Sequence, residues 1–264
     1  MSEFNYTKIL LIGGTSGIGH ALAEKILLSR PSAKLIVVGR RQEKLDEIVQ
    51  KWGKERVEGV VFDVTDLGGI EGFAKKILST NPDLSCLILN SGIQRPLDFT
   101  DPASISLDSI SEEFTTNYFS YVGFLKWFLP HFQQYKQDGQ DGETAVVMVG
   151  SVLGLVPMTR CPNYCASKAA LHQLILPLRK QMSDGPGNVK IVEVFPPSVQ
   201  TELHDKKHQP DIENGRQMGM PLDEFTDELW AGLSAGKEDI PVGMGKAIWE
   251  RIEPGRREEA GKFP

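Results

Sequence analysis

The chain has 264 residues, of which 40% are hydrophobic and 24% charged, fractions that are ordinary for a soluble globular protein. Its 29 basic and 35 acidic residues leave a formal net charge of -6, which gives no support for nucleic-acid binding. Three cysteines do not suggest a disulfide framework, and no apolar run approaches the roughly 18 residues that would span a bilayer.

These properties favour a cytoplasmic protein without a membrane or nucleic-acid partner. Residues 1–8 are short and polar and lack the basic and apolar regions of a secretory signal. The low cysteine content suits a reducing compartment. A chain of this length can bury a substantial core without disulfides or a structural metal.

Short apolar runs alternate with longer helical patterns along the chain. The runs are rich in Val, Ile and Leu, and they have the length of strands that are buried on both faces of a parallel sheet. We expect strands at 8–12, 35–38, 57–62, 84–89, 145–149 and 189–195, and a last short strand at 240–244. Helices are expected between them, at 18–28, 42–51, 70–78 and 166–182.

This alternation predicts an α/β fold with one doubly wound parallel sheet of about seven strands and helices on both faces, in a single domain over 1–264. Residues 105–135 have a long helical pattern with an aromatic stripe, from Phe114 to Phe128, that is expected to be buried or to face another subunit. Residues 202–221 are polar and aperiodic, so we expect a substrate lid there. The tail, 254–264, is expected to be solvated or disordered.

A glycine-rich turn follows the first expected strand directly and opens into a helix. Glycine lets the backbone turn tightly and approach a phosphate closely, and a helix N-terminus offers N–H groups and a positive dipole end. The spacing differs from the standard G-x-G-x-x-G pattern, but the position after a buried strand favours dinucleotide binding. The expected contacts are Gly13, Thr15, Ser16, Gly17, Ile18 and Gly19.

The end of the second strand predicts which dinucleotide is bound. Sites for NAD place an acidic side chain there for the ribose 2′-hydroxyl, whereas sites for NADP place a cation for the 2′-phosphate. Here the sequence reads Gly39-Arg40-Arg41, without an acid, and a planar guanidinium suits a phosphate. We therefore expect NADP(H), with Arg40 as a contact, and hold NAD as the alternative.

Two further polar groups follow expected strands. Asp63 and Val64 come after the third strand, and Asn90, Ser91 and Gly92 come after the fourth. Ligands of such sheets bind at the carboxyl ends of the strands, near the point where the strand order reverses. These residues are candidates for the walls around the adenosine and the nicotinamide ribose.

Tyr164 and Lys168 lie four residues apart in an expected helix and therefore share one face. A free phenol has a pKa of about 10, and a nearby ammonium favours the phenolate and lowers that pKa. Tyr164 is then a candidate general acid and base at a carbonyl oxygen. Ser151, just past the fifth strand, is expected to hydrogen-bond the same oxygen, and Asn117 to hold a water that links Lys168 to solvent.

In order and spacing these motifs resemble the short-chain dehydrogenase/reductase superfamily over nearly the whole chain, which implies a Rossmann-like fold. In that family the residues that match Asn117, Ser151, Tyr164 and Lys168 form a catalytic tetrad. Tyr164 and Lys168 are also expected to contact the cofactor, and the resemblance adds nicotinamide contacts at Pro196, Val199 and Thr201. Four longer stretches are similar to the DltE-like oxidoreductases within the superfamily, at 92–95, 156–158, 192–201 and 221–225.

The motifs together predict an oxidoreductase that transfers hydride between NADP(H) and a small carbonyl or secondary alcohol. The alternatives are an NADP(H)-binding sensor or scaffold on the same fold, and an NAD-dependent alcohol dehydrogenase. The resemblance implies a homodimer or homotetramer. The residues that select the substrate are expected within 94–99, 153–161 and 202–225.

Two groups of side chains near the expected site do not predict a function of their own. His204 and His208 lie four apart with Asp205 between them, but no third ligand is evident, so no metal is expected. Cys161 and Cys165 on either side of Tyr164 are interpreted as free thiols.

Overall fold

Seven parallel strands form a single sheet in the computed structural model, which describes residues 4–135, 137, 139–140, 142–187 and 189–263. The strand order is β3-β2-β1-β4-β5-β6-β7, and every neighbouring pair is parallel. The predicted α/β fold is therefore confirmed. The strands are β1 (Lys8–Ile12), β2 (Lys34–Gly39), β3 (Val57–Val61), β4 (Cys86–Leu89), β5 (Ala145–Val149), β6 (Lys190–Phe195) and β7 (Asp239–Pro241).

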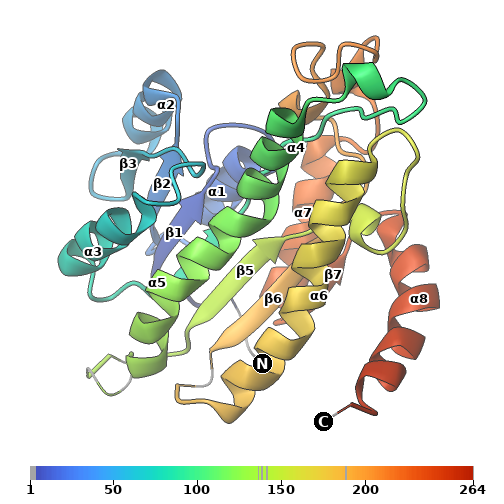
Figure 1. Cartoon of the computed structure of the whole chain (residues 1–264). Helices are drawn as coiled ribbons and strands as arrows, with labels where there is room; N and C mark the ends of the chain where they lie inside the picture. The colour runs from blue at the N-terminus through green and yellow to red at the C-terminus, as the bar shows by residue number, and fades with distance from the viewer. Residues whose placement is uncertain (1–3, 136, 138, 141, 188, 264) are drawn as a thin grey trace.

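Helices cover both faces of the sheet, as Figure 1 shows. Alternate residues of each strand point to opposite faces, so Leu11 of β1 belongs to one core and Leu10 to the other. Burial on both faces explains why the strands read as continuous apolar runs. One face carries α1 (Gly17–Ser29), α2 (Gln42–Trp52) and α7 (Leu222–Ser234), and the other carries α3 (Ile70–Thr80), α5 (Ser120–Gln134) and α6 (Pro162–Asp184).

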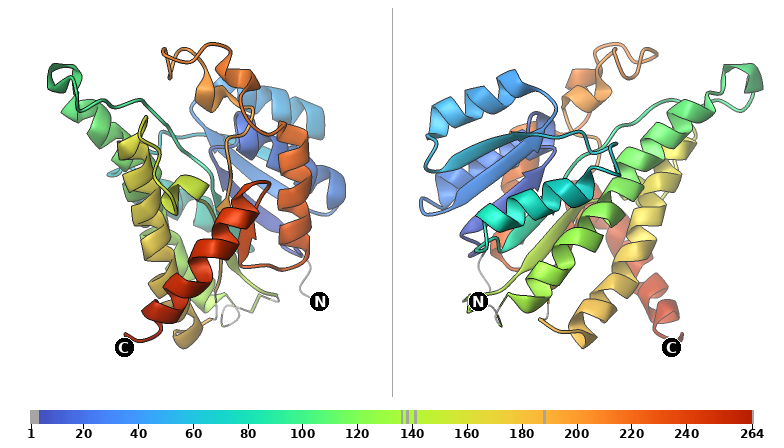
Figure 2. Two further views of the ribbon diagram at one scale, coloured as in Figure 1. Left: turned by 90° about the vertical axis from the view of Figure 1, so that its right-hand side faces the viewer. Right: turned by 60° about the vertical axis from the view of Figure 1, so that its left-hand side comes forward.

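The strand order reverses beside β1. The chain moves outward from β1 through β2 to β3, and then returns to place β4 on the other side of β1. The carboxyl ends of β1, β2 and β4 therefore meet at one edge of the sheet, and ligands of such sheets bind at this place. The views in Figure 2 show that the segment 202–221, in orange, rises at this same edge.

A π-helical turn interrupts the long helix that was predicted over 105–135. The helix consists of α4 (Leu107–Phe114), the π-helical turn (Thr115–Phe119) and α5. On α5 the aromatic stripe faces the sheet. Tyr121, Phe124 and Phe128 are fully buried there, in the core that also contains Leu10. Such π-helical turns are frequent at functional sites, and this one contains Asn117.

Several element boundaries differ from those that the sequence predicts, and two of the differences have a clear physical cause. Helix α6 begins at Pro162, four residues before the expected start, since proline is favoured at the first helical position. Strand β7 ends at Pro241 rather than at residue 244, because Gly243 adopts a left-handed φ of 54° that an extended strand does not continue. The segment 202–221 holds two short 3-10 turns, Glu202–His204 and Gly215–Gln217. In the described part of the chain, no helix is long and apolar enough to cross a membrane.

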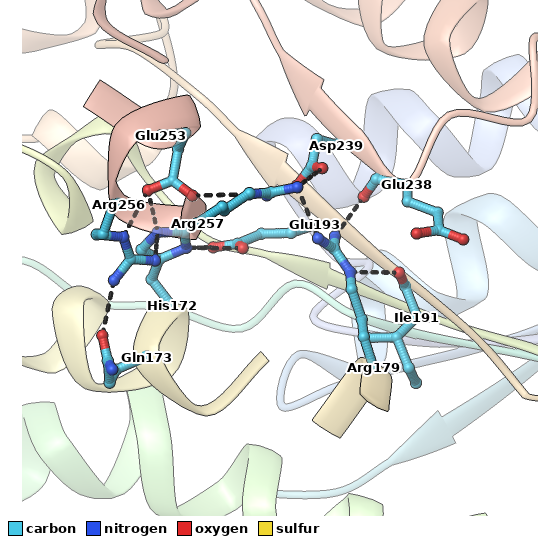
Figure 3. A network of polar contacts seen from close by, with 10 residues as sticks. All are labelled: His172, Gln173, Arg179, Ile191, Glu193, Glu238, Asp239, Glu253, Arg256 and Arg257. Carbon is cyan, nitrogen blue, oxygen red and sulfur yellow. Dashed lines mark hydrogen bonds and ion pairs between the residues drawn. The ribbon is translucent and has the colours of Figure 1, made fainter. Parts of the chain in front are cut away.

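The tail from residue 254, expected to be solvated or disordered, is helical up to Ala260, and most of its side chains are exposed. Helix α8 (Gly245–Ala260) continues through this stretch. Its charged residues pair with partners on other elements, as Figure 3 shows. Glu253 is fully buried and accepts a hydrogen bond from Nε2 of His172 at 2.8 Å. Arg257 binds both carboxylate oxygens of Asp239, at 2.7 and 2.8 Å.

His172 of α6 links the C-terminal helix to the sheet. Its Nδ1 lies 2.8 Å from the Glu193 carboxylate on β6, and its Nε2 lies 2.8 Å from the Glu253 carboxylate on α8. Burial works against the charged imidazole, but hydrogen bonds to the two carboxylates outweigh it and raise the His172 pKa. Glu193 also fills the space beside Gly150, the residue before Ser151. The network therefore lies directly behind the carboxyl end of β5.

Candidate active site

Four buried polar side chains gather beside the carboxyl end of β5. Ser151 follows the strand directly, and its Oγ accepts a hydrogen bond from the Leu153 N–H at 3.1 Å. Tyr164 and Lys168 lie in the first two turns of α6, and Asn117 lies in the π-helical turn. All four are at most 7% exposed. Burying polar side chains costs free energy unless they are hydrogen-bonded, so four of them in one place indicate a functional site.

The Lys168 ammonium lies between two aromatic rings. Its Nζ donates to the Val149 carbonyl at 2.9 Å, and it lies 5.9 Å from the centre of the Tyr164 ring and 5.6 Å from that of Tyr121. Burial lowers the Lys168 pKa to about 8, against the opposing charges of Glu193 and Glu113. At neutral pH the side chain is therefore still mainly a cation.

The pKa of Tyr164 shifts in the direction opposite to our expectation. Burial raises the pKa of the phenol, and a hydrogen bond with Ser151 only partly opposes this. The charges of Cys161, Glu113 and Cys165 raise it further. The prediction that a nearby ammonium lowers the pKa is wrong here, because desolvation of the buried phenol dominates. At neutral pH Tyr164 carries its proton.

Asn117 joins the loop after β4 to α6. Its Oδ1 accepts from the Ile93 N–H at 2.9 Å, and its Nδ2 donates to the Ile93 carbonyl at 2.9 Å and to Oγ of Ser167 at 3.0 Å. A Cβ added to Gly92 would lie 3.5 Å from Oδ1 of Asn117 and 3.8 Å from Nζ of Lys168. These side chains therefore share one corner of the site, and the water link through Asn117 stays a prediction.

The glycine turn is enclosed by the ends of β2 and β4. Gly13 has a φ of 83°, in the left-handed region that glycine adopts without strain, and its N–H donates to the Val38 carbonyl at 2.9 Å. A Cβ on Gly19 would lie 2.2 Å from the Gly13 carbonyl, so α1 begins this close only because Gly19 has no side chain. The Asn90 amide donates to the same carbonyl at 2.8 Å.

Sites for NAD place an acidic side chain at the end of β2. Here the space beside Gly39 is filled by the side chain of Thr15. A Cβ on Gly39 would lie 2.4 Å from Cγ2 of Thr15. Arg40, the predicted contact of the 2′-phosphate, is 61% exposed and lies 3.8 Å from the Asp63 carboxylate. The Asp63 pKa is held low because hydrogen bonds from Thr65 and the charge of Arg40 outweigh burial.

Arg41, which the sequence did not single out, lies against the glycine turn of the candidate site. Its Nη2 donates to the Thr15 carbonyl at 3.1 Å, and its Nη1 binds the Glu202 carboxylate at 2.8 Å. The Gly-Arg-Arg sequence offered either arginine, and only the folded chain shows which of them reaches the glycine turn.

The other predicted cofactor contacts lie at the same edge. A Cβ on Gly17 would lie 3.2 Å from the side chain of Thr201, so the residues after β6 lie against the turn. The Pro196 carbonyl accepts from the Val152 N–H at 3.0 Å, beside Ser151. The remaining members follow β1, β3, β4 and β6: Ser16, Ile18, Val64, Ser91 and Val199.

Gln209 joins the three segments that were predicted to select the substrate. This fully buried side chain donates to Oε1 of Gln94 at 2.9 Å and lies 3.0 Å from Nδ1 of His204. Arg160 donates to Oε1 of Gln209 and to both carboxylate oxygens of Asp211, each at 2.6 Å. No sequence pattern pointed to Gln209. Among the described residues, no group of His, Cys, Asp or Glu side chains is arranged to hold a metal ion.

Comparison with known proteins gives consistent matches. The model of the short chain dehydrogenase family matches residues 7–211. The chain is 32% identical to the oxidoreductase DltE of Bacillus subtilis over 232 residues, which cover 88% of this chain and 86% of that protein. A short-chain dehydrogenase from Sphingobium yanoikuyae in complex with NADPH superposes with a TM-score of 0.79, at 23% identity, over 98% of this chain and 96% of that one. One from Burkholderia cenocepacia in complex with NADP has a TM-score of 0.76, at 22% identity, over 99% of each chain.

Proposed function

Because the chain belongs to the short-chain dehydrogenase/reductase family of oxidoreductases, we propose that it transfers hydride between NADP(H) and a carbonyl or secondary alcohol. The observation that carries this proposal is the buried group of Ser151, Tyr164 and Lys168 beside the glycine turn. The cofactor supplies the hydride when it is bound. The protein's own side chains then have to hold the carbonyl group and move a proton at its oxygen.

The proton chemistry follows from the states of these side chains. Tyr164 carries its proton at neutral pH and donates it to the carbonyl oxygen during reduction. Ser151 hydrogen-bonds the same oxygen and fixes its position. The Lys168 ammonium stabilises the tyrosinate that remains, because it is still charged at neutral pH and lies beside the ring. Oxidation of an alcohol runs through the same groups in reverse.

The residues at the sheet edge fit a dinucleotide with a 2′-phosphate. The glycine turn and the N-terminus of α1 would hold the pyrophosphate, and the corner at Gly92 would receive the nicotinamide ribose near Lys168. Thr15 fills the place of an NAD-binding acid beside Gly39, and Arg40 and Arg41 follow directly. These features support NADP(H) over NAD, with Asp63, Val64, Asn90, Ser91, Pro196, Val199 and Thr201 as further contacts.

The assembly and location of the protein are part of the same proposal. Phe119 and Val122, which are 49% and 38% exposed, lie on the long helix and support pairing of subunits into a homodimer or homotetramer. The three cysteines are free thiols, which suits the cytoplasm. The segment 202–221 would act as the lid over the substrate.

The test is a search for turnover with matched cofactors. NADPH oxidation is followed with aldehydes, ketones, diketones and quinones, and NADH serves as the control. We expect turnover with at least one carbonyl, and faster with NADPH. Tight NADPH binding without any turnover would favour the sensor or scaffold, and NAD binding at least as tight as NADP binding would favour an NAD-dependent enzyme.

A further inference from the structure

We propose that Glu202 competes with the 2′-phosphate of the cofactor for Arg41, and thereby sets how strongly the site prefers NADP over NAD. This inference rests on the proposed use of NADP(H). It assigns a specificity-determining role to the first residue of the lid segment and to an arginine that the sequence pattern left open.

The guanidinium of Arg41 lies at the place where a dinucleotide site reads the ribose 2′ position. Its Nη2 donates to the Thr15 carbonyl at 3.1 Å. Thr15 in turn lies against Gly39, the last residue of β2, where a Cβ would come within 2.4 Å of its methyl group. The end of the second strand is the position that distinguishes the 2′-hydroxyl of NAD from the 2′-phosphate of NADP.

Arg41 already has an anionic partner at this position. Its Nη1 lies 2.8 Å from Oε2 of Glu202, with both side chains just over one third exposed. Arg40 is more exposed, and its ion pair among the described residues is with Asp63, at 3.8 Å. Arg40 is thus accessible to a phosphate, whereas a phosphate that binds Arg41 has to approach the Glu202 carboxylate. Like charges at such short range repel each other, so one anion weakens the binding of the other.

The backbone at Glu202 is fixed close to the glycine turn. Oγ of Thr201 accepts the Leu203 N–H at 3.3 Å, and Thr201 packs against Gly17. Because the backbone is fixed, the Glu202 carboxylate can leave Arg41 only when the Glu202 side chain rotates toward solvent. A nucleotide without the 2′-phosphate does not require this movement. Glu202 thus penalises NADP and leaves NAD unaffected.

The experiment measures binding of the two adenine nucleotides that differ only in the 2′-phosphate. Adenosine 2′,5′-bisphosphate and adenosine 5′-phosphate are titrated calorimetrically, at low ionic strength, into the wild type and into Glu202→Gln, Arg41→Met and the double variant. Lys44→Met is the matched control for loss of a nearby cation, since Lys44 pairs only with Glu47 on the exposed side of α2 among the described residues. Neither nucleotide contains nicotinamide, so the readout is independent of activity.

We expect Glu202→Gln to tighten binding of the bisphosphate by about two- to fivefold, the range of an exposed ion pair, and to leave the monophosphate unchanged. Arg41→Met should weaken binding of the bisphosphate, and the double variant should lose the gain from Glu202→Gln. Unchanged or weaker bisphosphate binding in Glu202→Gln overturns the competition, as does a gain from Glu202→Gln that persists in the double variant. A wild type that binds neither nucleotide overturns the proposed function itself.

Discussion

The Lys168 ammonium lies 5.9 Å from the centre of the Tyr164 ring and is held there by a 2.9 Å hydrogen bond to the Val149 carbonyl. The helix spacing and a strand carbonyl together fix the cation beside the phenol. The two residues therefore share one task, since the proton leaves from one side chain and the resulting charge is stabilised by the other.

Replacing Tyr164 by Phe should lower turnover by about 10²- to 10⁴-fold, because the ring remains but the transferable proton is lost. NADPH binding, measured by fluorescence titration, should stay close to that of the wild type. The steady-state rate of NADPH oxidation with the best carbonyl of the panel checks this. Near-normal turnover in this variant would refute the mechanism.

The rate of reduction should fall as the pH rises through about 8, because Lys168 loses its proton there. Its burial lowers the pKa, so the charged form that stabilises the tyrosinate is complete below this pH and is lost above it. A profile of kcat/KM against pH, with circular dichroism to verify folding at each point, measures the effect. A profile that stays flat well into the alkaline range would show that the Lys168 charge is not required.

Replacing Gly39 by Asp should move the cofactor preference toward NAD by about tenfold or more, or roughly 1.4 kcal/mol, in the ratio of the two dissociation constants. The new carboxylate would repel a 2′-phosphate and offer an acceptor to a 2′-hydroxyl. Since a Cβ at this position meets Thr15 at 2.4 Å, the variant is paired with Gly39→Asp/Thr15→Ser, which relieves the contact with the methyl group. An unchanged ratio in both variants would show that this position does not read the ribose.

Loss of the His172 imidazole should destabilise the protein by about 3–5 kcal/mol, because the buried Glu193 carboxylate loses its hydrogen-bond partner and Glu253 keeps only Arg256 and Arg257. Urea denaturation of His172→Gln measures this. Gln173→Ala is the matched control, since Gln173 is the next residue of α6 but only makes an exposed contact with Arg256. If Gln173→Ala lowered the free energy of unfolding as much as His172→Gln does, the imidazole would have no special role.

The same network should make stability depend on pH in two windows. The His172 pKa is raised, so its contribution is complete below the ordinary value of 6.5 and is lost as the pH rises through the folded-state value. The pKa of Glu253 is lowered to about 2, against its burial, by hydrogen bonds from His172 and Arg256. Its contribution is complete above 4.5 and is lost as the pH falls toward 2. Denaturation midpoints of the wild type and of Glu253→Gln that run parallel across both windows would contradict this.

The sequence predicts the interior of this fold better than its connections. The bounds of β1 and β5 agree with the expected strands to the residue, because strands buried on both faces show as continuous apolar runs. The charged stretch after Glu253 gives no such signal. Its arginines resemble solvated surface residues, and only the fold shows that Asp239 and Glu253 are their partners.

The candidate site shows the same division. The motif order brings Ser151, Tyr164 and Lys168 together because Ser151 comes just after a strand and the other two lie four residues apart near the start of α6. Gln209 and Arg41 were missed, since their roles depend on contacts with segments far away in the chain. The pKa of Tyr164 was given the wrong direction, because burial cannot be read from helix spacing.

The position of α8 has a consequence for biosynthesis. Glu253 follows His172 by 81 residues, so at about 5–20 residues per second it leaves the ribosome about 4–16 s later. Until α8 has been made, His172 and Glu193 lack the helix that covers them in the folded protein. The half-built domain is then open to chaperones and proteases on the side behind Ser151.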